Sequence, residues 1–218
     1  MSWKCHGRSN AELITNLQKH GILSSKPAAE AMLKMDRADF VPDRHSSYID
    51  APQSIGYGAT ISAPHMHAYC LSMLEDHLKP GMSILDVGSG SGYLTAVIAL
   101  MVGESGRTIG IEYVPELVEK SIEAIRNGPA GQLLESGTLS IHVVDGKQGY
   151  PGGAPYDAIH VGAAAAEIPQ SLLEQLKPGG RMVIPVGKSM QELLVVDKHS
   201  DGSITEQHVM GVAYVPLV

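Results

Sequence analysis

A glycine-rich loop is the sharpest chemical motif in the sequence, and it spans residues 85–92 as Leu-Asp-Val-Gly-Ser-Gly-Ser-Gly. A short apolar segment leads into it, and an apolar helical pattern begins at Tyr93. Glycines permit positive φ angles and let the backbone approach a ligand closely. In a parallel sheet such a ligand binds outside the carboxyl ends of the strands. Glu112 ends the next strand pattern, where its carboxylate can accept both hydroxyls of a ribose. The unit therefore predicts a site for an adenosine-containing cofactor.

Two features distinguish S-adenosyl-L-methionine from a dinucleotide as that cofactor. The dinucleotide fingerprint is G-x-G-x-x-G, whereas here the third glycine comes one position early, at Gly92. Asp86 would repel a pyrophosphate but suits a ligand that carries an ammonium and a sulfonium. The pattern favours S-adenosyl-L-methionine, with a nicotinamide-dependent oxidoreductase or a plain tight turn as alternatives. Asp145 and Gly146 follow the third strand pattern, where they either bind an adenine amino group or form an ordinary turn.

A second unusual segment, residues 52–67, combines small and hydroxyl residues with two histidines. Ser62, His65 and Asp86 are the residue types of a hydrolase triad, but no G-x-S-x-G elbow follows a strand. His65 and His67 are metal-ligand types, but nothing beside them completes a site. The segment is best interpreted as a loop that faces the cofactor and the substrate.

Other reactive or polarisable side chains have simpler interpretations. His160 lies inside an apolar strand pattern and is expected to be a hydrogen-bonded core residue. Cys70 lies on an apolar helix face and is expected to be buried and inert. Met32, Met35 and Met73 are expected to be packing residues.

Composition excludes several classes of function. A chain of 218 residues with 44% hydrophobic and 18% charged residues suits one α/β domain with a sizeable core. The net charge is −7 and no basic stripe occurs, which argues against a nucleic-acid partner. Two scattered cysteines indicate a reducing compartment. The longest apolar run, residues 93–102, is shorter than the roughly 20 residues that span a bilayer. We expect a cytosolic protein without a signal peptide or membrane segment.

The first part of the chain has helical periodicity over residues 10–19, 26–35 and 64–78, with Asn10 as the N-cap of the first helix. Residues 42–64 hold five prolines or glycines and predict a long structured loop that contains neither helix nor strand. Loops of this length within a domain are usually functional.

From residue 83 onward, strand and helix patterns alternate. The predicted strands cover residues 83–87, 108–112, 138–144, 157–161 and 181–185, and the predicted helices cover 93–101, 115–126 and 168–176. Two closing strands, 192–197 and 209–215, should be antiparallel. This alternation predicts an α/β, Rossmann-like fold with a mostly parallel, twisted sheet and helices on both faces. We expect a single domain over residues 1–218, in which 1–78 form a helical cap with the substrate loop and 79–218 form the cofactor-binding core.

Together these segments resemble the protein-L-isoaspartate O-methyltransferase family, and its eukaryotic members most closely. The resemblance covers essentially the whole chain. The block Thr60-Ile-Ser-Ala-Pro64 combined with the glycine loop is highly specific, whereas the glycine loop alone is not. The other matching blocks are Trp3-Lys4, Ala11-Glu-Leu-Ile14, Ile159-His-Val-Gly-Ala-Ala164, Leu176-Lys-Pro-Gly-Gly180, Ile184-Pro-Val-Gly187 and Gly211-Val-Ala-Tyr-Val-Pro216.

The resemblance implies transfer of a methyl group from S-adenosyl-L-methionine to the free α-carboxylate of L-isoaspartyl residues, with S-adenosyl-L-homocysteine as the product. The methyl ester then collapses to a succinimide, which reopens partly to normal aspartate, so the net effect is repair. The implied partners are isoaspartyl-containing proteins and peptides, with no nucleic acid and no membrane, and we expect a monomer. The resemblance also implies that the last two strands are swapped relative to most such methyltransferases.

Site residues are carried over from the resemblance by position. Ser62 matches the catalytic serine, and Val218 stands where relatives have a threonine near the cofactor and continue further. The residues matched to cofactor binding are Ile61, Ser62, Ala63, Pro64 and His67 in the loop, Asp86, Gly88, Ser89 and Gly90 at the methionine end, Glu112 at the ribose, and Asp145 and Gly146 at the adenine. No metal ligand is implied.

The chemistry needs little beyond orientation. A carboxylate with a pKa near 4 is already ionised at neutral pH, so no strong general base is required. Proximity and orientation contribute up to roughly 7–11 kcal/mol in favourable reactions. Ser62 and backbone groups of residues 60–64 and 212–216 would orient the carboxylate. A protein that keeps the fold but has lost activity is the non-enzymatic alternative.

Overall fold

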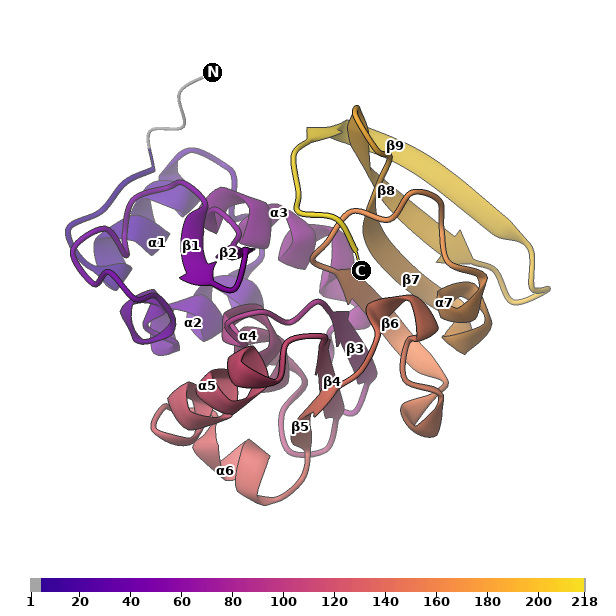
Figure 1. Ribbon diagram of the computed structural model, residues 1–218, viewed down its shortest axis with the longest axis horizontal. Helices are drawn as coiled ribbons and strands as arrows, with labels where there is room; N and C mark the ends of the chain where they lie inside the picture. Colours follow the sequence, from indigo (N-terminus) through magenta and orange to yellow (C-terminus); the bar gives the residue numbers. More distant parts are fainter. Residues whose placement is uncertain (1–4, 218) are drawn as a thin grey trace.

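A seven-stranded sheet organises the chain in this computed structural model, which describes residues 5–217 (Figure 1). Its strands are β3 (Ser83–Val87), β4 (Arg107–Glu112), β5 (Leu139–Val143), β6 (Tyr156–Val161), β7 (Leu176–Val186), β8 (Gln191–Lys198) and β9 (Ile204–Val212). The order across the sheet is β5-β4-β3-β6-β7-β8-β9. The first five strands are parallel, and β8 and β9 are antiparallel. This confirms the predicted α/β fold with a mostly parallel sheet.

The two faces of the sheet are covered unequally. The helices are α1 (Asn10–Lys19), α2 (Lys26–Lys34), α3 (Pro64–Leu74), α4 (Tyr93–Val102), α5 (Pro115–Arg126), α6 (Gly131–Glu135) and α7 (Gln170–Gln175). Alternate residues of a strand point to opposite faces, so Ile84 joins the apolar cluster of α1 to α6 and Leu85 joins the cluster under α7. The N-terminal helices thus pack onto α4 and α5 on one face, and α7 lies on the other (Figure 1).

Helix α1 is capped one residue earlier than predicted. The Ser9 hydroxyl accepts a hydrogen bond from the Glu12 amide at 3.2 Å, so Ser9 is the N-cap and the prediction for Asn10 is wrong. Asn10 is buried, and its amide donates to the carbonyls of Met32 at 2.9 Å and Met35 at 3.3 Å. Asn10 therefore ties α1 to the end of α2 instead of starting its own helix.

The segment predicted to be an irregular loop contains a hairpin. Strands β1 (Gln53–Gly56) and β2 (Ala59–Ile61) pair antiparallel within residues 42–64. Gly56, Tyr57 and Gly58 at its turn have φ angles of 88°, 55° and 74°. Glycine favours this left-handed region, so the residues that suggested an irregular loop form the turn of a hairpin. Lys120 Nζ of α5 lies 4.9 Å from the centre of the Tyr57 ring.

Other boundaries shift by a few residues. The predicted helix over 64–78 ends at Leu74 and continues as the 3-10 helix η2 (Glu75–His77). The predicted helix over 168–176 shortens to α7, because Leu176 already pairs with Tyr156 in the sheet. Strand β9 begins at Ile204, well before the predicted residue 209, and α6 was not predicted.

The segment after β9 returns across the carboxyl ends of the parallel strands. The Ala164 amide donates to the Val215 carbonyl, and the Leu217 amide donates to the Ala164 carbonyl, both at 2.8 Å. Leu217 is buried against the α7 side of the sheet. Figure 1 shows this C-terminal segment running back beside β6. The last described residues therefore help to close the functional site.

Candidate active site

Two adjoining cavities lie at the carboxyl ends of β3, β4 and β6. The larger has a volume of about 220 Å³ and the smaller about 30 Å³. Thr60, Gly88, Gly90 and Gly162 line both, so the two cavities share one wall. The order of strands reverses between β3 and β6, which is where α/β sheets bind ligands.

The glycine loop is pinned to the neighbouring strand. The amides of Gly88 and Ser89 both donate to the Ile111 carbonyl, at 2.8 and 3.0 Å. Gly88 and Gly90 have φ angles of 71° and 53°, which side-chain-bearing residues rarely adopt. The loop can make this turn because glycine occupies both positions, and the turn exposes backbone to the cavities.

Glu112 connects the glycine loop to the end of β4. Its Oε2 accepts from the Gly90 amide at 2.9 Å, and its Oε1 accepts from the amides of Tyr113 at 2.8 Å and Val114 at 3.1 Å. An ionised carboxylate has about four acceptor sites, so Glu112 can still accept from a ligand hydroxyl. It lines the larger cavity, as predicted from its place after the strand.

One side of the larger cavity is mostly apolar. Ile111, Val144, Val215 and Leu217 line it together with Gly146. The neighbouring Asp145 does not line it: its Oδ1 accepts from the Lys147 amide at 2.9 Å and caps the 3-10 helix η3 (Gly146–Gln148). The pair Asp145-Gly146 therefore contributes its glycine to the wall and its aspartate to a turn.

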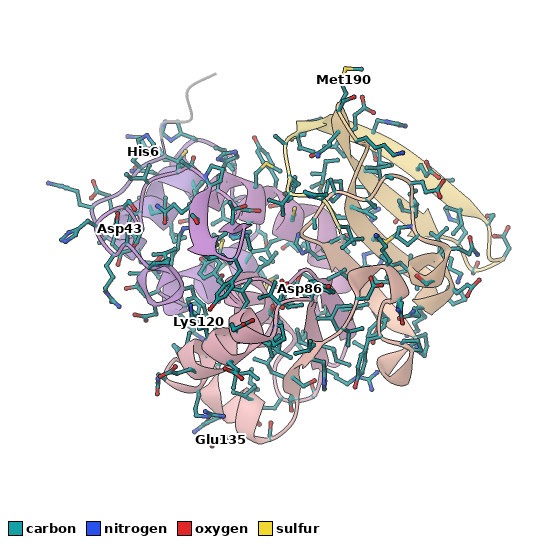
Figure 2. All side chains as sticks on the ribbon, in the orientation of Figure 1. His6, Asp43, Asp86, Lys120, Glu135 and Met190 are labelled. Carbon is teal, nitrogen blue, oxygen red and sulfur yellow. The ribbon has the colours of Figure 1, made fainter. Side chains whose placement is uncertain are left out.

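Asp86 and His160 form a buried ion pair at the smaller cavity. Nδ1 of His160 lies 2.7 Å from Oδ1 of Asp86, and the Thr95 hydroxyl donates to Oδ2 at 2.5 Å. Burial by itself lowers the pKa of His160, but hydrogen bonds to Asp86 and to Cys70 outweigh it and raise the pKa to about 10. His160 is the hydrogen-bonded core residue that we expected, and it also lines the cavity. Figure 2 labels Asp86 near the centre of the molecule.

His67 is a neutral histidine on the same cavity. Burial, followed by the charges of Arg37, His160 and His65, holds its pKa well below the ordinary 6.5. Its Nδ1 is buried and has no hydrogen bond partner among residues 5–217, and the same is true of Oγ of Ser89. Buried polar atoms nearly always have a partner, so these two atoms mark a place where a polar ligand belongs.

Ser62 lies where the hairpin ends and the smaller cavity begins. Its side chain interacts with that of Tyr214, whose phenol has a pKa raised above its usual value by burial and by Cys70. The backbone of Tyr214 is held in turn by Gln191, which accepts from its amide at 2.6 Å and donates to its carbonyl at 3.0 Å. The segment of Tyr214 is therefore fixed beside Ser62.

The side chains considered for a hydrolase triad do not assemble. The His65 amide donates to Oδ1 of Asp50 at 2.9 Å, and Nδ1 of His65 lies 2.7 Å from the same oxygen. Asp86 is paired with His160 instead. The arrangement Ser62–His65–Asp86 is therefore absent from the described chain.

Most of the predicted site residues are brought together. Those that line one of the two cavities are Ile61, Ser62, His67, Asp86, Gly88, Ser89, Gly90, Glu112 and Gly146. Ala63, Pro64 and Asp145 do not line either, since Ala63 and Pro64 form the start of α3. Val218, Trp3 and Lys4 lie outside the described residues. Lining residues that were not named individually as predicted site residues include Tyr57, Tyr113, Val114, Ala163 and Pro216.

Known proteins of one family are similar to this chain over nearly its whole length. The family model for protein-L-isoaspartate(D-aspartate) O-methyltransferase matches residues 8–218. Protein-L-isoaspartate O-methyltransferase 1 of Arabidopsis thaliana is 59% identical over 95% of this chain and 90% of its own length. The Caenorhabditis elegans protein-L-isoaspartate O-methyltransferase is 49% identical over 100% of this chain and 96% of its own.

A solved structure has the same fold over nearly its full length. It is a Plasmodium falciparum protein described as a protein-L-isoaspartate O-methyltransferase, in complex with S-adenosyl-L-homocysteine. Its TM-score is 0.90 at 34% identity, and the match covers 97% of this chain and 99% of that one.

Proposed function

Since this chain belongs to the protein-L-isoaspartate(D-aspartate) O-methyltransferase family, we propose roles for its own residues in the family's reaction. The chain transfers a methyl group from S-adenosyl-L-methionine to the free α-carboxylate of L-isoaspartyl residues in damaged proteins and peptides. This methylation is a step of protein repair, and S-adenosyl-L-homocysteine is the other product. The roles below concern which residues hold the cofactor and which orient the carboxylate.

The larger cavity is proposed to hold the adenosine and the smaller one the methionine end. The residues fit this division. Apolar side chains such as Ile111 and Leu217 suit an adenine ring, and Glu112 has acceptor sites left for ribose hydroxyls. At the smaller cavity, the unpartnered Nδ1 of His67 and Oγ of Ser89 would gain partners from the polar methionine groups. Ile61, Gly88, Gly90 and Gly146 complete these walls. Ala63 and Pro64 act indirectly by starting α3, and Asp145 acts indirectly by capping η3 beside Gly146.

The ion pair of Asp86 and His160 suits a zwitterion. The methionine end carries an ammonium and a carboxylate, and the smaller cavity is lined by one buried anion and one buried cation. We assign the ammonium to the Asp86 side and the carboxylate to the His160 side. Because His67 is neutral, the cavity gains no further positive charge near the sulfonium.

Ser62 is assigned the role of orienting the substrate carboxylate. S-adenosyl-L-methionine supplies a methyl group on a positively charged sulfur. The carboxylate is already ionised, so the chain's contribution is to hold it in line and to exclude water. A serine hydroxyl donates one hydrogen bond to a carboxylate oxygen. The position of Ser62 on the rim of the smaller cavity is the single observation that supports this role most directly.

Methyl transfer to two matched peptides tests the function. The peptides differ only in L-isoaspartate against L-aspartate at one position, and the methyl group of the cofactor is radiolabelled. Label is expected on the isoaspartyl peptide alone. Label on neither peptide, with S-adenosyl-L-homocysteine bound, would support the inactive alternative.

A serine pair separates the role of Ser62 from a general loop effect. Ser62→Ala should lower kcat/KM for the isoaspartyl peptide by roughly tenfold to hundredfold, the loss of one hydrogen bond to a charged group. Ser54→Ala, an exposed serine in β1 of the same hairpin, should leave it unchanged. Equal activity of Ser62→Ala and the wild type would overturn the assignment.

Domain organisation and surroundings are proposals of the same kind. We propose one domain in which residues 1–78 supply the Ser62 loop and 79–218 the cofactor core, because Met32, Leu71 and Val97 belong to one continuous apolar cluster. A cytosolic monomer without a nucleic-acid partner fits the net charge of −7.

Within residues 5–217, no helix is both long and apolar enough to cross a membrane. Light scattering after gel filtration tests the monomer, and limited proteolysis around residue 79 tests the single domain.

A further inference from the structure

A fully buried arginine lies behind the loop that carries Ser62. Arg37 begins the 3-10 helix η1 (Arg37–Phe40), whose start is capped by the Asp36 carboxylate on the Ala38 amide at 2.9 Å. The exposed fraction of Arg37 is 0%. Arginine is almost never fully buried unless it is paired, so its partners at this position show what it does there.

Among residues 5–217, the guanidinium makes a single hydrogen bond. Nη2 of Arg37 donates to the main-chain carbonyl of Ser62 at 2.9 Å. Nε and Nη1 are buried and have no hydrogen bond partner in the described part of the chain. The group lies 5.8 Å from the centre of the Tyr93 ring, within reach of a cation–π interaction. An arginine has five N–H donors, and the donor of Arg37 that has a defined partner binds the loop that carries Ser62.

Arg37 remains a cation at neutral pH. Burial lowers its pKa to about 10, and the effects of Tyr93 and Asp50 oppose that decrease. A buried cation with few partners lowers the stability of a fold unless something compensates it. Stability alone therefore does not explain why Arg37 is there, and the contact with Ser62 offers a functional reason.

The bond fixes one particular peptide unit. Ser62 lies between β2, which ends at Ile61, and α3, whose N-cap is Ala63. The Ala63 carbonyl already accepts from the Met66 amide at 2.9 Å and belongs to the helix, whereas the Ser62 carbonyl is turned toward Arg37. Arg37 therefore fixes the Ser62–Ala63 peptide at the junction between strand and helix.

The orientation of this peptide has a second effect. The bond between Ser62 and Ala63 is trans, so its N–H points to the side opposite its carbonyl. With the carbonyl held toward the buried guanidinium, the Ala63 N–H points away from Arg37. The buried guanidinium therefore sets the orientation of the Ser62–Ala63 peptide.

We propose that Arg37 is a positioning residue for methyl transfer, which holds the Ser62 carbonyl from the core side and so fixes the direction of the Ser62 hydroxyl toward the substrate carboxylate. This inference rests on the proposed role of Ser62. Arg37 contacts neither the substrate nor the cofactor in this account and acts through the loop alone.

Two substitutions and a matched control test the proposal. Arg37→Met removes the charge and the donors at similar length, and Arg37→Lys keeps the charge without the planar fork. We expect Arg37→Met to lower kcat/KM for the isoaspartyl peptide by roughly tenfold to hundredfold, and Arg37→Lys to lower it less. The Kd of S-adenosyl-L-homocysteine should stay within about twofold in both. Arg44→Met is the control, because Arg44 is exposed and pairs with Asp39 at 3.0 Å on the surface.

A double-mutant cycle separates positioning from a structural role. If Arg37 acts through the Ser62 hydroxyl, Arg37→Met in a Ser62→Ala background should reduce kcat/KM by less than about threefold further. A full additive loss, or an equal loss of cofactor affinity, would overturn the proposal. If Arg37→Met does not fold, the same cycle is run with Arg37→Lys, to which the same two outcomes apply.

The failure of the proposed function would look different. If wild-type chain does not methylate the isoaspartyl peptide, the substrate assignment fails before any variant is compared. If Ser62→Ala is fully active while Arg37→Met is not, the positioning role fails although the methyltransferase activity stands.

Discussion

Gly162 and Gly88 approach so closely that a Cβ atom added to Gly162 would lie 2.9 Å from the Gly88 carbonyl oxygen. The Gly162 amide also donates to the Val87 carbonyl at 2.7 Å. Real Cβ atoms essentially never lie that close to a backbone oxygen. The contact joins the end of β6 to the glycine loop, and both glycines line the two cavities.

Gly162→Ala is expected to weaken cofactor binding. The added methyl group must push β6 away from the glycine loop, and overpacking of this kind typically destabilises by about 1–3 kcal/mol. Calorimetric titration should show a Kd for S-adenosyl-L-homocysteine raised at least about tenfold, and the melting temperature should fall. Gly211→Ala is the control, since a Cβ there would meet open space. Equal cofactor affinity in the two variants would mean that the close contact does not shape the site.

Glu112→Ala is expected to weaken the cofactor through two effects. It removes the acceptor for the amides of Gly90, Tyr113 and Val114 and the proposed acceptor for the ribose. A hydrogen bond to a charged group contributes about 1.5–3 kcal/mol, so the Kd for S-adenosyl-L-homocysteine should rise at least about tenfold. Glu112→Gln, which keeps one acceptor oxygen, should have a smaller effect. Glu116→Ala, an exposed glutamate in the first turn of α5, should have none.

The ion pair of His160 should make stability depend on pH on the alkaline side. The folded-state pKa of His160 is raised from 6.5 to about 10, against the effect of burial, by Asp86 of β3 and Cys70 of α3, and His67 of α3 also faces it. A raised pKa stabilises the fold fully below pH 6.5, and this stabilisation is lost as pH rises toward 10. Urea unfolding at pH 6.5 and 9.5 should therefore show a larger decrease for the wild type than for His160→Gln. Parallel decreases would contradict the pairing.

Gln191→Ala should affect the substrate more than the cofactor. Its side chain makes two hydrogen bonds to the backbone of Tyr214, whose phenol interacts with Ser62. Without them the Tyr214 segment should become less ordered, and each neutral hydrogen bond contributes about 0.5–1.5 kcal/mol. Steady-state kinetics should show kcat/KM for the isoaspartyl peptide lowered by several-fold, with the cofactor Kd unchanged. Gln207→Ala, an exposed residue of β9, is the control for a general effect on the edge of the sheet. A cofactor Kd that changes by as large a factor as kcat/KM would contradict a selective effect on the substrate.

The strands and helices of the core could be predicted because their signals are local. Residues 83–87 form a short apolar run, and apolar residues recur with the period of a helix in 115–126; both segments match the bounds in the structure. The hairpin of β1 and β2 was not predicted, because glycines such as Gly56 and Gly58 are typical of irregular loops as well as of tight turns. The early start of β7 depends on its partner Tyr156, which no local pattern reveals.

A lining residue could be predicted where its position at the end of a strand is enough to bring it to the cavity, as it is for Glu112. A contact between residues far apart in the sequence could not be predicted in this way. The contact between Asp86 and His160 is of this distant type, since the two residues are separated by 74 positions. Arg37 likewise meets Ser62 only through the fold. Asp145 shows the turn that the sequence offered as one alternative, because a short acidic side chain readily accepts from the backbone amide two residues further on.

The larger cavity takes its wall from segments spread over most of the chain, from Tyr57 in the hairpin to Leu217 after the last strand. Such contacts form only once the intervening chain has been synthesised and folded, and long-range contacts form slowly. A ligand that binds only the folded state stabilises that state. In a cell, the cofactor would therefore engage a nascent chain only after Leu217 has been synthesised, and its concentration would influence how many folded molecules survive proteolysis.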